Sequence, residues 1–339
     1  MKPESVDDEL VSRAAHLLIK LDWKVWYFGD NAGFWGLQAA TELTGDGLFS
    51  YFGYGLVKAW SARRSPRRKY DQTLPGVECL ELAERFGDNR LIEALIDHAE
   101  WLCSRTREDG VYLTDDDYPR LIWVDTLAVH APFLAGLGRY DPRYYRRACE
   151  FLMPNVKLLQ DGTGLFCHTY DVDTRNANGV HWGRGQGWAM AGLFETWKRL
   201  PSTFPQRAEI ALMLKHNMDS LIRLQRADGH WHTIIDDERS YVEPSVAAFY
   251  VLVGCRALTC GLISQDHIEH LERAWIAVKS SFSEEGRYVG VSEDTWTGEP
   301  EYYRSVGRNS FSPWSQGPAV AAMDEYNRFR KWMAQHGHA

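Results

Sequence analysis

The stretch GWAMAGLFETWKRL, residues 187–200, determines the fold that we predict for this sequence. It opens with small residues, continues with apolar residues at the i, i+3 and i+4 spacing of a helix, and ends in charged residues. Five further stretches share this pattern and cover residues 34–46, 75–88, 124–141, 243–263 and 316–329. The pattern therefore predicts six apolar helices, distributed along a chain of 339 residues.

Between the apolar stretches lie helical patterns that are more polar on one face. They cover residues 6–21, 90–104, 143–153, 206–226 and 265–280. β-Strand alternation is confined to short pieces such as GRYVGV, residues 286–291. An irregular α-bundle or solenoid would fit an all-α chain, but the six-fold count favours a closed (α/α)6 barrel with the apolar helices inside. We expect one such domain over residues 1–339.

The composition excludes several classes of protein. A formal net charge of −8 argues against a protein that coats nucleic acid or an anionic membrane. The sequence has neither a run of about 18 apolar residues nor the pattern of a signal peptide. The six cysteines are scattered, and the histidines match no metal-binding motif. We therefore expect a cytoplasmic protein that needs no metal or organic cofactor, and the oligomeric state stays open.

The aromatic content and its placement point towards sugars. The chain has 14 Trp, 16 Tyr and 14 Phe residues, which suit a carbohydrate cleft, although large helical cores also collect aromatics. The segments that precede the apolar helices are rich in Trp, Tyr, Asp, Arg and Asn. In an (α/α)6 barrel these segments would meet at one mouth and line a polar, aromatic cleft.

Three polar residues in these segments are candidates for chemistry or binding. Asp125, in the apolar run LIWVDTLAV, either caps the helix that follows or is a general acid kept protonated by neighbours such as Trp123. Asp71, in KYDQTLPG, is either a turn residue or a second carboxylate for acid–base chemistry. Asn31, in FGDNAG, is an ordinary loop residue or a substrate-binding one.

The stretch HWGRGQGW, residues 181–188, combines glycines with large rigid side chains. Its three glycines predict backbone crowding at the start of a helix, where an anion can also bind. Trp182 and Trp188 either pack the ends of helical hairpins or stack on a sugar ring. Arg184 either pairs with a protein carboxylate or binds the carboxylate of that sugar. His168 precedes this stretch, and a lone histidine is usually structural.

Four segments resemble a known family: LIWVDTLAVHAPFLAGLG, WGRGQGWAMAGL, YDQTLPGVECLELAERFGD and WSQGPAVAAMDE. Together they resemble the unsaturated rhamnogalacturonyl hydrolases of glycoside hydrolase family 105 and the related unsaturated glucuronyl hydrolases of family 88. The resemblance covers nearly the whole chain. It implies an (α/α)6 barrel that removes a 4,5-unsaturated uronic acid from the non-reducing end of lyase-generated oligosaccharides, without a cofactor.

The resemblance also implies roles for individual residues. Asp125 matches the general acid/base, and Asp71 matches the assisting carboxylate. The matching sugar-binding positions are Trp182, Arg184, Trp188 and His168, and we predict Asn31 as a further substrate-binding residue. Thr114 stands near the place where the family often has a histidine, so the sugar can differ from the family's usual one.

Three other functions stay open at this point. The chain could be a conventional glycosidase, or a sugar epimerase that uses His130 and His168 as a pair. It could also be a sugar-binding protein without catalytic activity. The carboxylate within WVDT favours an enzyme, because a protein that only binds sugar has little reason to keep it.

Overall fold

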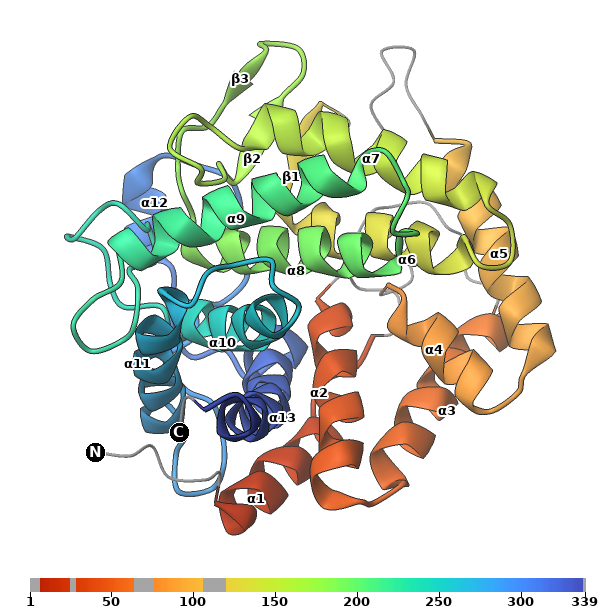
Figure 1. The fold of residues 1–339 in the computed structure, drawn as a ribbon, viewed down its shortest axis with the longest axis horizontal. Coiled ribbons are helices and arrows are strands. Elements are labelled where there is room, and N and C mark those ends of the chain that lie inside the picture. Colours follow the sequence, from red (N-terminus) through yellow and green to blue (C-terminus); the bar gives the residue numbers. More distant parts are fainter. Residues whose placement is uncertain (1–6, 25–28, 64–75, 106–119, 338–339) are drawn as a thin grey trace.

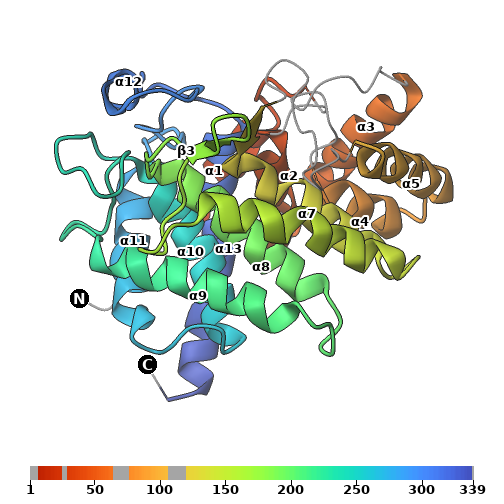
Figure 2. The same ribbon diagram turned by 90° about the horizontal axis from the view of Figure 1, so that it is seen from above.

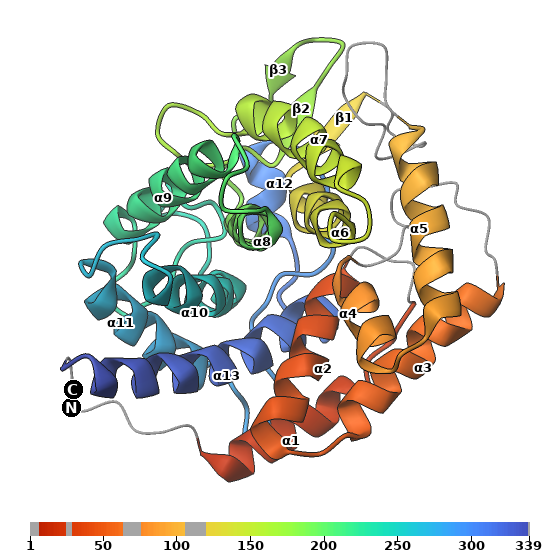
Figure 3. The same cartoon turned by 45° about the vertical axis from the view of Figure 1, so that its right-hand side comes forward.

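A computed structural model describes residues 7–24, 29–63, 76–105 and 120–337. Within these ranges, six helices form an inner ring and six surround them, so the predicted (α/α)6 barrel is confirmed (Figures 1 and 3). The inner helices are α2 (Asp30–Thr44), α4 (Glu78–Arg85), α6 (His130–Leu137), α8 (Gly183–Arg199), α10 (Pro244–Thr259) and α13 (Pro313–Gln335). The outer helices are α1 (Asp8–Leu18), α3 (Leu48–Arg63), α5 (Asn89–Cys103), α7 (Arg143–Leu159), α9 (Arg207–Arg223) and α11 (His267–Ser280).

Burial explains the difference between the two rings. The inner helix α10 buries every residue from Pro244 to Leu258 except Arg256, because it has neighbours on all sides. The outer helix α7 buries one face and exposes the other, as its two-faced sequence predicts. The buried apolar side chains of both rings form one core cluster that runs around the barrel.

The ring closes where α13 meets α2 and α1. A Cβ atom on Gly317 would lie 2.0 Å from the carbonyl oxygen of Ala32, so only glycine allows α13 to approach α2 this closely. The side chain of Gln316 donates hydrogen bonds to the carbonyl of Ala14 at 3.0 Å and to that of Gly286 at 2.8 Å. The last inner helix is thereby joined to the first two helices of the chain.

Two details differ from the sequence prediction. Helix α3 had not been predicted, because glycines and aromatic residues in LFSYFGYGLVKAWSAR obscure its two-faced pattern. The strand expected at residues 286–291 is absent from the structure, where only an isolated bridge pairs Tyr288 with Phe282. Gly286 and Gly290 have φ angles of 84° and 82°, which are incompatible with a continuous strand.

The strands that do form lie at one end of the barrel. β1 (Leu121–Trp123), β2 (Thr169–Asp171) and β3 (Asn176–Ala177) make an antiparallel sheet in the order β1-β2-β3. The short helix α12 (Pro300–Ser305) lies on the same side of the helical ring as β3 (Figure 2). None of the helices in the described ranges is both long enough and apolar enough to cross a bilayer.

Candidate active site

The small sheet brings Asp125 and His168 side by side. Antiparallel pairing places Trp123 opposite Thr169, and the amide of Val124 donates to the carbonyl of His168 at 3.0 Å. The chain then turns into a 3₁₀ helix, η2 (Val124–Ala128), which carries Asp125 next to His168. The carboxylate Oδ2 of Asp125 lies 3.5 Å from Nε2 of His168, and both residues are buried.

The position of Asp125 tests its helix-cap interpretation. Helix α6 begins at His130, and Asp125 lies within the preceding 3₁₀ helix. The helix-cap interpretation is therefore wrong. A buried carboxylate whose recorded partner is a histidine is instead the arrangement expected of a group with a chemical role.

A chain of hydrogen bonds orients His168. Asn178 Nδ2 donates to the hydroxyl oxygen of Tyr303 at 2.9 Å, and that hydroxyl lies 2.7 Å from Nδ1 of His168. Burial lowers the pKa of His168 although Asp125 raises it, so the ring is neutral at neutral pH. Burial raises the pKa of Tyr303, so its hydroxyl keeps its proton and is able to donate to Nδ1 of the imidazole tautomer that is protonated on Nε2. In that tautomer the Nε2–H faces Asp125.

Aromatic rings and one cation surround this pair. The ring of Trp182 lies 4.3 Å from that of His168, measured between centroids, and Trp123 meets the same imidazole edge-on at 5.3 Å. The guanidinium of Arg184 lies 4.5 Å from the centroid of Trp182. Asp125, His168, Trp182 and Arg184 thus form one continuous cluster, although they come from sequence segments that lie far apart.

The terminal nitrogens of Arg184 hold a neighbouring loop. Nη1 donates to the carbonyl and hydroxyl of Ser292 at 2.7 and 2.5 Å. Nη2 donates to the carbonyl of Glu293 at 2.9 Å and to the hydroxyl of Thr295 at 3.3 Å. The guanidinium is fixed by these bonds, and it brings a buried positive charge next to Trp182.

The glycines of the motif occur where the backbone is crowded, as predicted. A Cβ atom on Gly185 would lie 2.9 Å from the side chain of Val124, and one on Gly187 would lie 2.5 Å from the ring of Phe249. Further along α8, a Cβ atom on Gly192 would lie 2.3 Å from the carbonyl oxygen of Leu127. These glycines let α8 pack directly against η2 and thereby set the position of Asp125.

Two further predicted residues, Trp188 and Asn31, lie in the interior of the barrel. Trp188 is fully buried, and its ring packs against Trp35 and Phe249 at 6.1 and 5.1 Å. Asn31 is also fully buried and donates from Nδ2 to the carbonyl of Ala128 at 3.1 Å, which links the start of α2 to η2. Asp71 and Thr114 lie outside the described residues.

The geometry gives no support to an epimerase-like histidine pair. The His130 ring packs edge-on against Phe151 of outer helix α7 at 5.2 Å, whereas His168 faces Asp125. Burial lowers the pKa of His130 to about 3, so this residue is neutral. In the described ranges, no group of three or more His, Cys, Asp or Glu side chains is placed to hold a metal ion.

Sequence reasoning missed three residues that shape the site: Tyr303, Asn178 and Glu243. Tyr303 and Asn178 orient His168. Glu243 is fully buried and accepts a hydrogen bond at 3.1 Å from the amide of Ser292, the residue that Arg184 also binds. Tyr303 and Asn178 lie in short segments without periodicity. The YVEP segment before α10 offered a weak signal for Glu243, because it is one of the polar segments that precede the inner helices.

These features together define a class of protein. A ring of six helical hairpins, with a buried carboxyl group, a neutral histidine in contact with two indoles, and an arginine where the inner helices begin, is an (α/α)6-barrel enzyme acting on carbohydrate.

Comparison with known proteins identifies the family. The model of Glycosyl Hydrolase Family 88 matches residues 4–330, and the chain belongs to this family of glycoside hydrolases. The chain is 26% identical to the unsaturated rhamnogalacturonyl hydrolase YesR of Bacillus subtilis (strain 168), over 98% of this chain and 97% of that protein.

Solved structures share the fold. A possible member of the GH105 family from Salmonella enterica has a TM-score of 0.86 at 21% identity, covering 98% of this chain and 97% of its own. The unsaturated glucuronyl hydrolase of Bacillus sp. GL1, responsible for the degradation of glycosaminoglycan, has a TM-score of 0.74 at 18% identity and covers 95% of each chain. At these identities the likeness concerns the fold.

Proposed function

We propose that this protein hydrolyses the non-reducing-end 4,5-unsaturated uronic acid from oligosaccharides that polysaccharide lyases produce. The observation that carries the proposal is the buried carboxyl group of Asp125 beside Nε2 of neutral His168, in one cluster with Trp182 and Arg184. Membership of Glycosyl Hydrolase Family 88 supports it, and so does the similarity to a named unsaturated rhamnogalacturonyl hydrolase along nearly the whole chain.

The first step is a proton transfer from Asp125 to the sugar. The C4=C5 double bond next to the ring oxygen is an enol ether, so protonation at C4 leaves a positive charge on C5 that the ring oxygen shares. Asp125 then becomes a carboxylate, and the Nε2–H of His168 faces the oxygen that gains the negative charge. A hydrogen bond that strengthens as charge develops favours the transition state over the bound substrate.

The second step adds water to C5. The Asp125 carboxylate accepts a proton from the water as its oxygen bonds to C5, which regenerates the acid. The hemiketal at C5 then opens, and the aglycone leaves from C1 without direct attack on that carbon. In this proposal Asp71 assists as the second carboxylate. The spacing rule that separates retaining from inverting glycosidases does not apply to this route.

The remaining residues bind the uronide. Trp182 offers its indole face to the sugar ring, and Arg184 supplies the positive charge that the uronate carboxylate needs. Asn31 and Trp188 complete the proposed set, with Trp188 acting from the interior of the barrel. We propose that residues 1–339 form one catalytic domain that works in the cytoplasm, and its six unpaired cysteines support a reducing compartment.

The proposal is tested by following the ultraviolet absorbance of the conjugated unsaturated uronide. Lyase-generated disaccharides from pectin, glycosaminoglycan and ulvan would each be incubated with the protein. We expect the absorbance to fall with at least one of them, which also identifies the uronic acid and its aglycone. Folded protein that consumes no unsaturated disaccharide, whatever its aglycone, would contradict the proposal.

A further inference from the structure

A tryptophan lies exposed next to the candidate site. Trp296 is 52% exposed, and the other tryptophans in the described ranges are all less exposed. Its ring centroid is 6.0 Å from that of Trp123, at an interplanar angle of 77°. Trp123 in turn contacts His168, the partner of Asp125. The aromatic contacts therefore connect the neighbourhood of the buried Asp125 to the exposed ring of Trp296.

The segment that carries Trp296 is held from inside the barrel. Buried Arg184 binds Ser292, Glu293 and Thr295 through its two terminal nitrogens. Buried Glu243 accepts a hydrogen bond from the amide of Ser292 at 3.1 Å. Two charged side chains that are costly to bury thus converge on one short surface segment.

The other end of the segment is anchored as well. The amide of Trp296 donates to the hydroxyl of Tyr302 at 2.8 Å. The hydroxyl of Thr297 lies 2.7 Å from that of Thr169 on β2, the strand that follows His168. Residues 292–297 are therefore fixed to α8, α10, α12 and β2, and the exposed indole is presented in a preorganised position.

We propose that Trp296 forms a platform for the aglycone, on which the sugar joined to the unsaturated uronide stacks one of its C–H faces. This inference rests on the proposed function. The sugar that is protonated would lie beside Asp125, His168 and Trp182, which are buried. Trp296 is exposed and contacts Trp123, so it lies further out, where the sugar joined to the uronide would extend from the site. A half-exposed indole provides a flat apolar surface for a pyranose ring.

The charges next to the platform indicate the kind of aglycone. Glu293 and Asp294 are exposed and lie directly before Trp296 in the anchored segment. Carboxylates at a binding surface repel an acidic or sulfated sugar at low ionic strength. The platform therefore suits a neutral pyranose.

The test separates the aglycone from the uronide. Trp296→Ala and Trp296→Phe would be assayed on two substrates, an unsaturated uronide linked to rhamnose and the methyl glycoside of the same uronide. Tyr51→Ala is the matched control, because Tyr51 is an exposed aromatic residue on α3 that has no contact with the site cluster. We expect Trp296→Ala to raise KM for the disaccharide about five- to tenfold with kcat within twofold.

The other measurements complete the pattern. Kinetics of the methyl glycoside should be unchanged in Trp296→Ala, Trp296→Phe should retain most of the affinity for the disaccharide, and Tyr51→Ala should match wild type on both substrates. An unchanged KM for the disaccharide, or an equal rise for both substrates, would overturn the platform while leaving the proposed function intact. If the wild-type protein consumed neither substrate but did consume an unsaturated uronide linked to an acidic or sulfated sugar, the platform would be overturned and the proposed function would stand. If it consumed no unsaturated uronide at all, both would fail.

Discussion

The two ends of the barrel use charged side chains in opposite ways. Asp125, Trp182 and Arg184 lie where inner helices begin, whereas a cavity of about 440 Å³ is lined by residues from the later turns of several of the same helices. Arg184 and Arg199 belong to the first and last turns of α8, and 15 residues of helix separate them by about 22 Å. The cavity is therefore at the far end from the candidate site.

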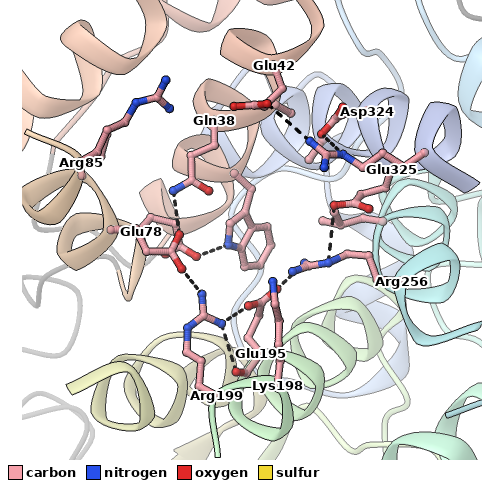
Figure 4. A pocket seen from close by; sticks show the side chains of 17 residues that line it. Gln38, Glu42, Glu78, Arg85, Glu195, Lys198, Arg199, Arg256, Asp324 and Glu325 are labelled. Carbon is pink, nitrogen blue, oxygen red and sulfur yellow. Dashed lines mark hydrogen bonds and ion pairs between the residues drawn. The ribbon is translucent and has the colours of Figure 1, made fainter. Parts of the chain in front are cut away.

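At the far end, hydrogen bonds and ion pairs join several of the inner helices (Figure 4). Gln38 of α2 donates to Glu81 of α4, which accepts from Arg199 of α8. Glu195 accepts from both Arg199 and Arg256 of α10, and Nε of Arg256 lies 3.5 Å from Glu325 of α13. The charges of this end are largely used to hold the helices of the ring together.

The candidate site has a different balance. Its carboxylate, Asp125, faces a neutral histidine rather than an arginine, and its arginine binds backbone and hydroxyl oxygens of a loop. An ion pair would consume the acid that the reaction needs, because a paired carboxylate resists protonation. The comparison teaches that the arginines of the far end pair with carboxylates of other helices, whereas Asp125 has His168 as its ion-pair partner in the described part of the chain.

The largest effect is expected from Asp125→Asn. The substitution keeps the shape of the side chain but removes the proton donor, so kcat/KM for the unsaturated disaccharide should fall by about 10³-fold. Thermal unfolding should be little changed, because Asp125 joins no ion pair with an arginine or lysine in the described ranges. The measurement is the loss of ultraviolet absorbance together with a melting curve. Turnover that stays near the wild-type rate would refute the assignment of the acid.

Glu195→Gln should lower stability and leave turnover unchanged, which is the reverse of the effect expected from Asp125→Asn. It leaves Arg199 and Arg256 partly buried without their shared carboxylate, which should cost about 3 kcal/mol of unfolding free energy. Turnover per folded molecule should be unchanged, since 11 residues of helix separate Glu195 from Arg184, which is about 17 Å along α8. The control is Glu42→Gln, because Glu42 is half-exposed and 3.8 Å from Arg328, so its loss should cost less than about 1 kcal/mol. Denaturant unfolding of both variants separates the two cases.

Much of the fold was readable from the sequence because helical periodicity is local. The six inner stretches and five of the outer helices were predicted, and each contains its own apolar pattern. Helix α3 escaped because its aromatic residues and glycines do not alternate with polar ones. The sheet of β1, β2 and β3 escaped because strands of two or three residues carry no usable period.

The site was predictable only where its residues share a motif or a resemblance. Trp182 and Arg184 stand two residues apart at the start of α8, so their proximity follows from the sequence. The pairing of Asp125 with His168 depends on the β1–β2 register, which no local pattern encodes. Tyr303 reaches His168 only through the folded position of α12, and thus no sequence signal could have assigned it.

A smaller effect on activity should follow from Tyr303→Phe. The variant loses the hydroxyl that donates to Nδ1 of His168, so the imidazole proton is no longer directed to Nε2 and towards Asp125. We expect kcat to fall about tenfold with KM nearly unchanged, and the pH–rate profile to shift. Tyr54→Phe is the control, because the Tyr54 hydroxyl on outer helix α3 donates to Asp88 at 2.7 Å and not to a residue of the site. A higher KM with an unchanged kcat would instead mean that Tyr303 only supports the structure of its loop.

The smallest effect concerns the pH dependence of stability next to Trp182. The ring nitrogens of His181 lie 2.8 Å from a carboxylate oxygen of Asp236 and 2.9 Å from one of Asp161. Burial opposes the positive charge of His181, but the hydrogen bond to Asp236 helps to raise its pKa to about 10. Its ordinary pKa is 6.5, so its stabilisation is complete below pH 6.5 and is lost as the pH rises towards 10. The two aspartates have lowered pKa values, so their part is lost on acidification below about pH 4.

The variant His181→Gln tests this window. Because both aspartates are partly exposed, we expect a loss of about 1 kcal/mol between pH 4 and 6.5, which should shrink as the pH approaches 10. Urea unfolding of both proteins at several pH values gives the difference directly. A difference that stayed constant from pH 5 to 10 would mean that His181 acts through packing and not through its charge. Unlike Glu195, His181 directly precedes Trp182, so the same variant should also raise KM modestly. An effect on both stability and KM would distinguish a charge pair at the candidate site from one at the far end of the barrel, where only stability should change.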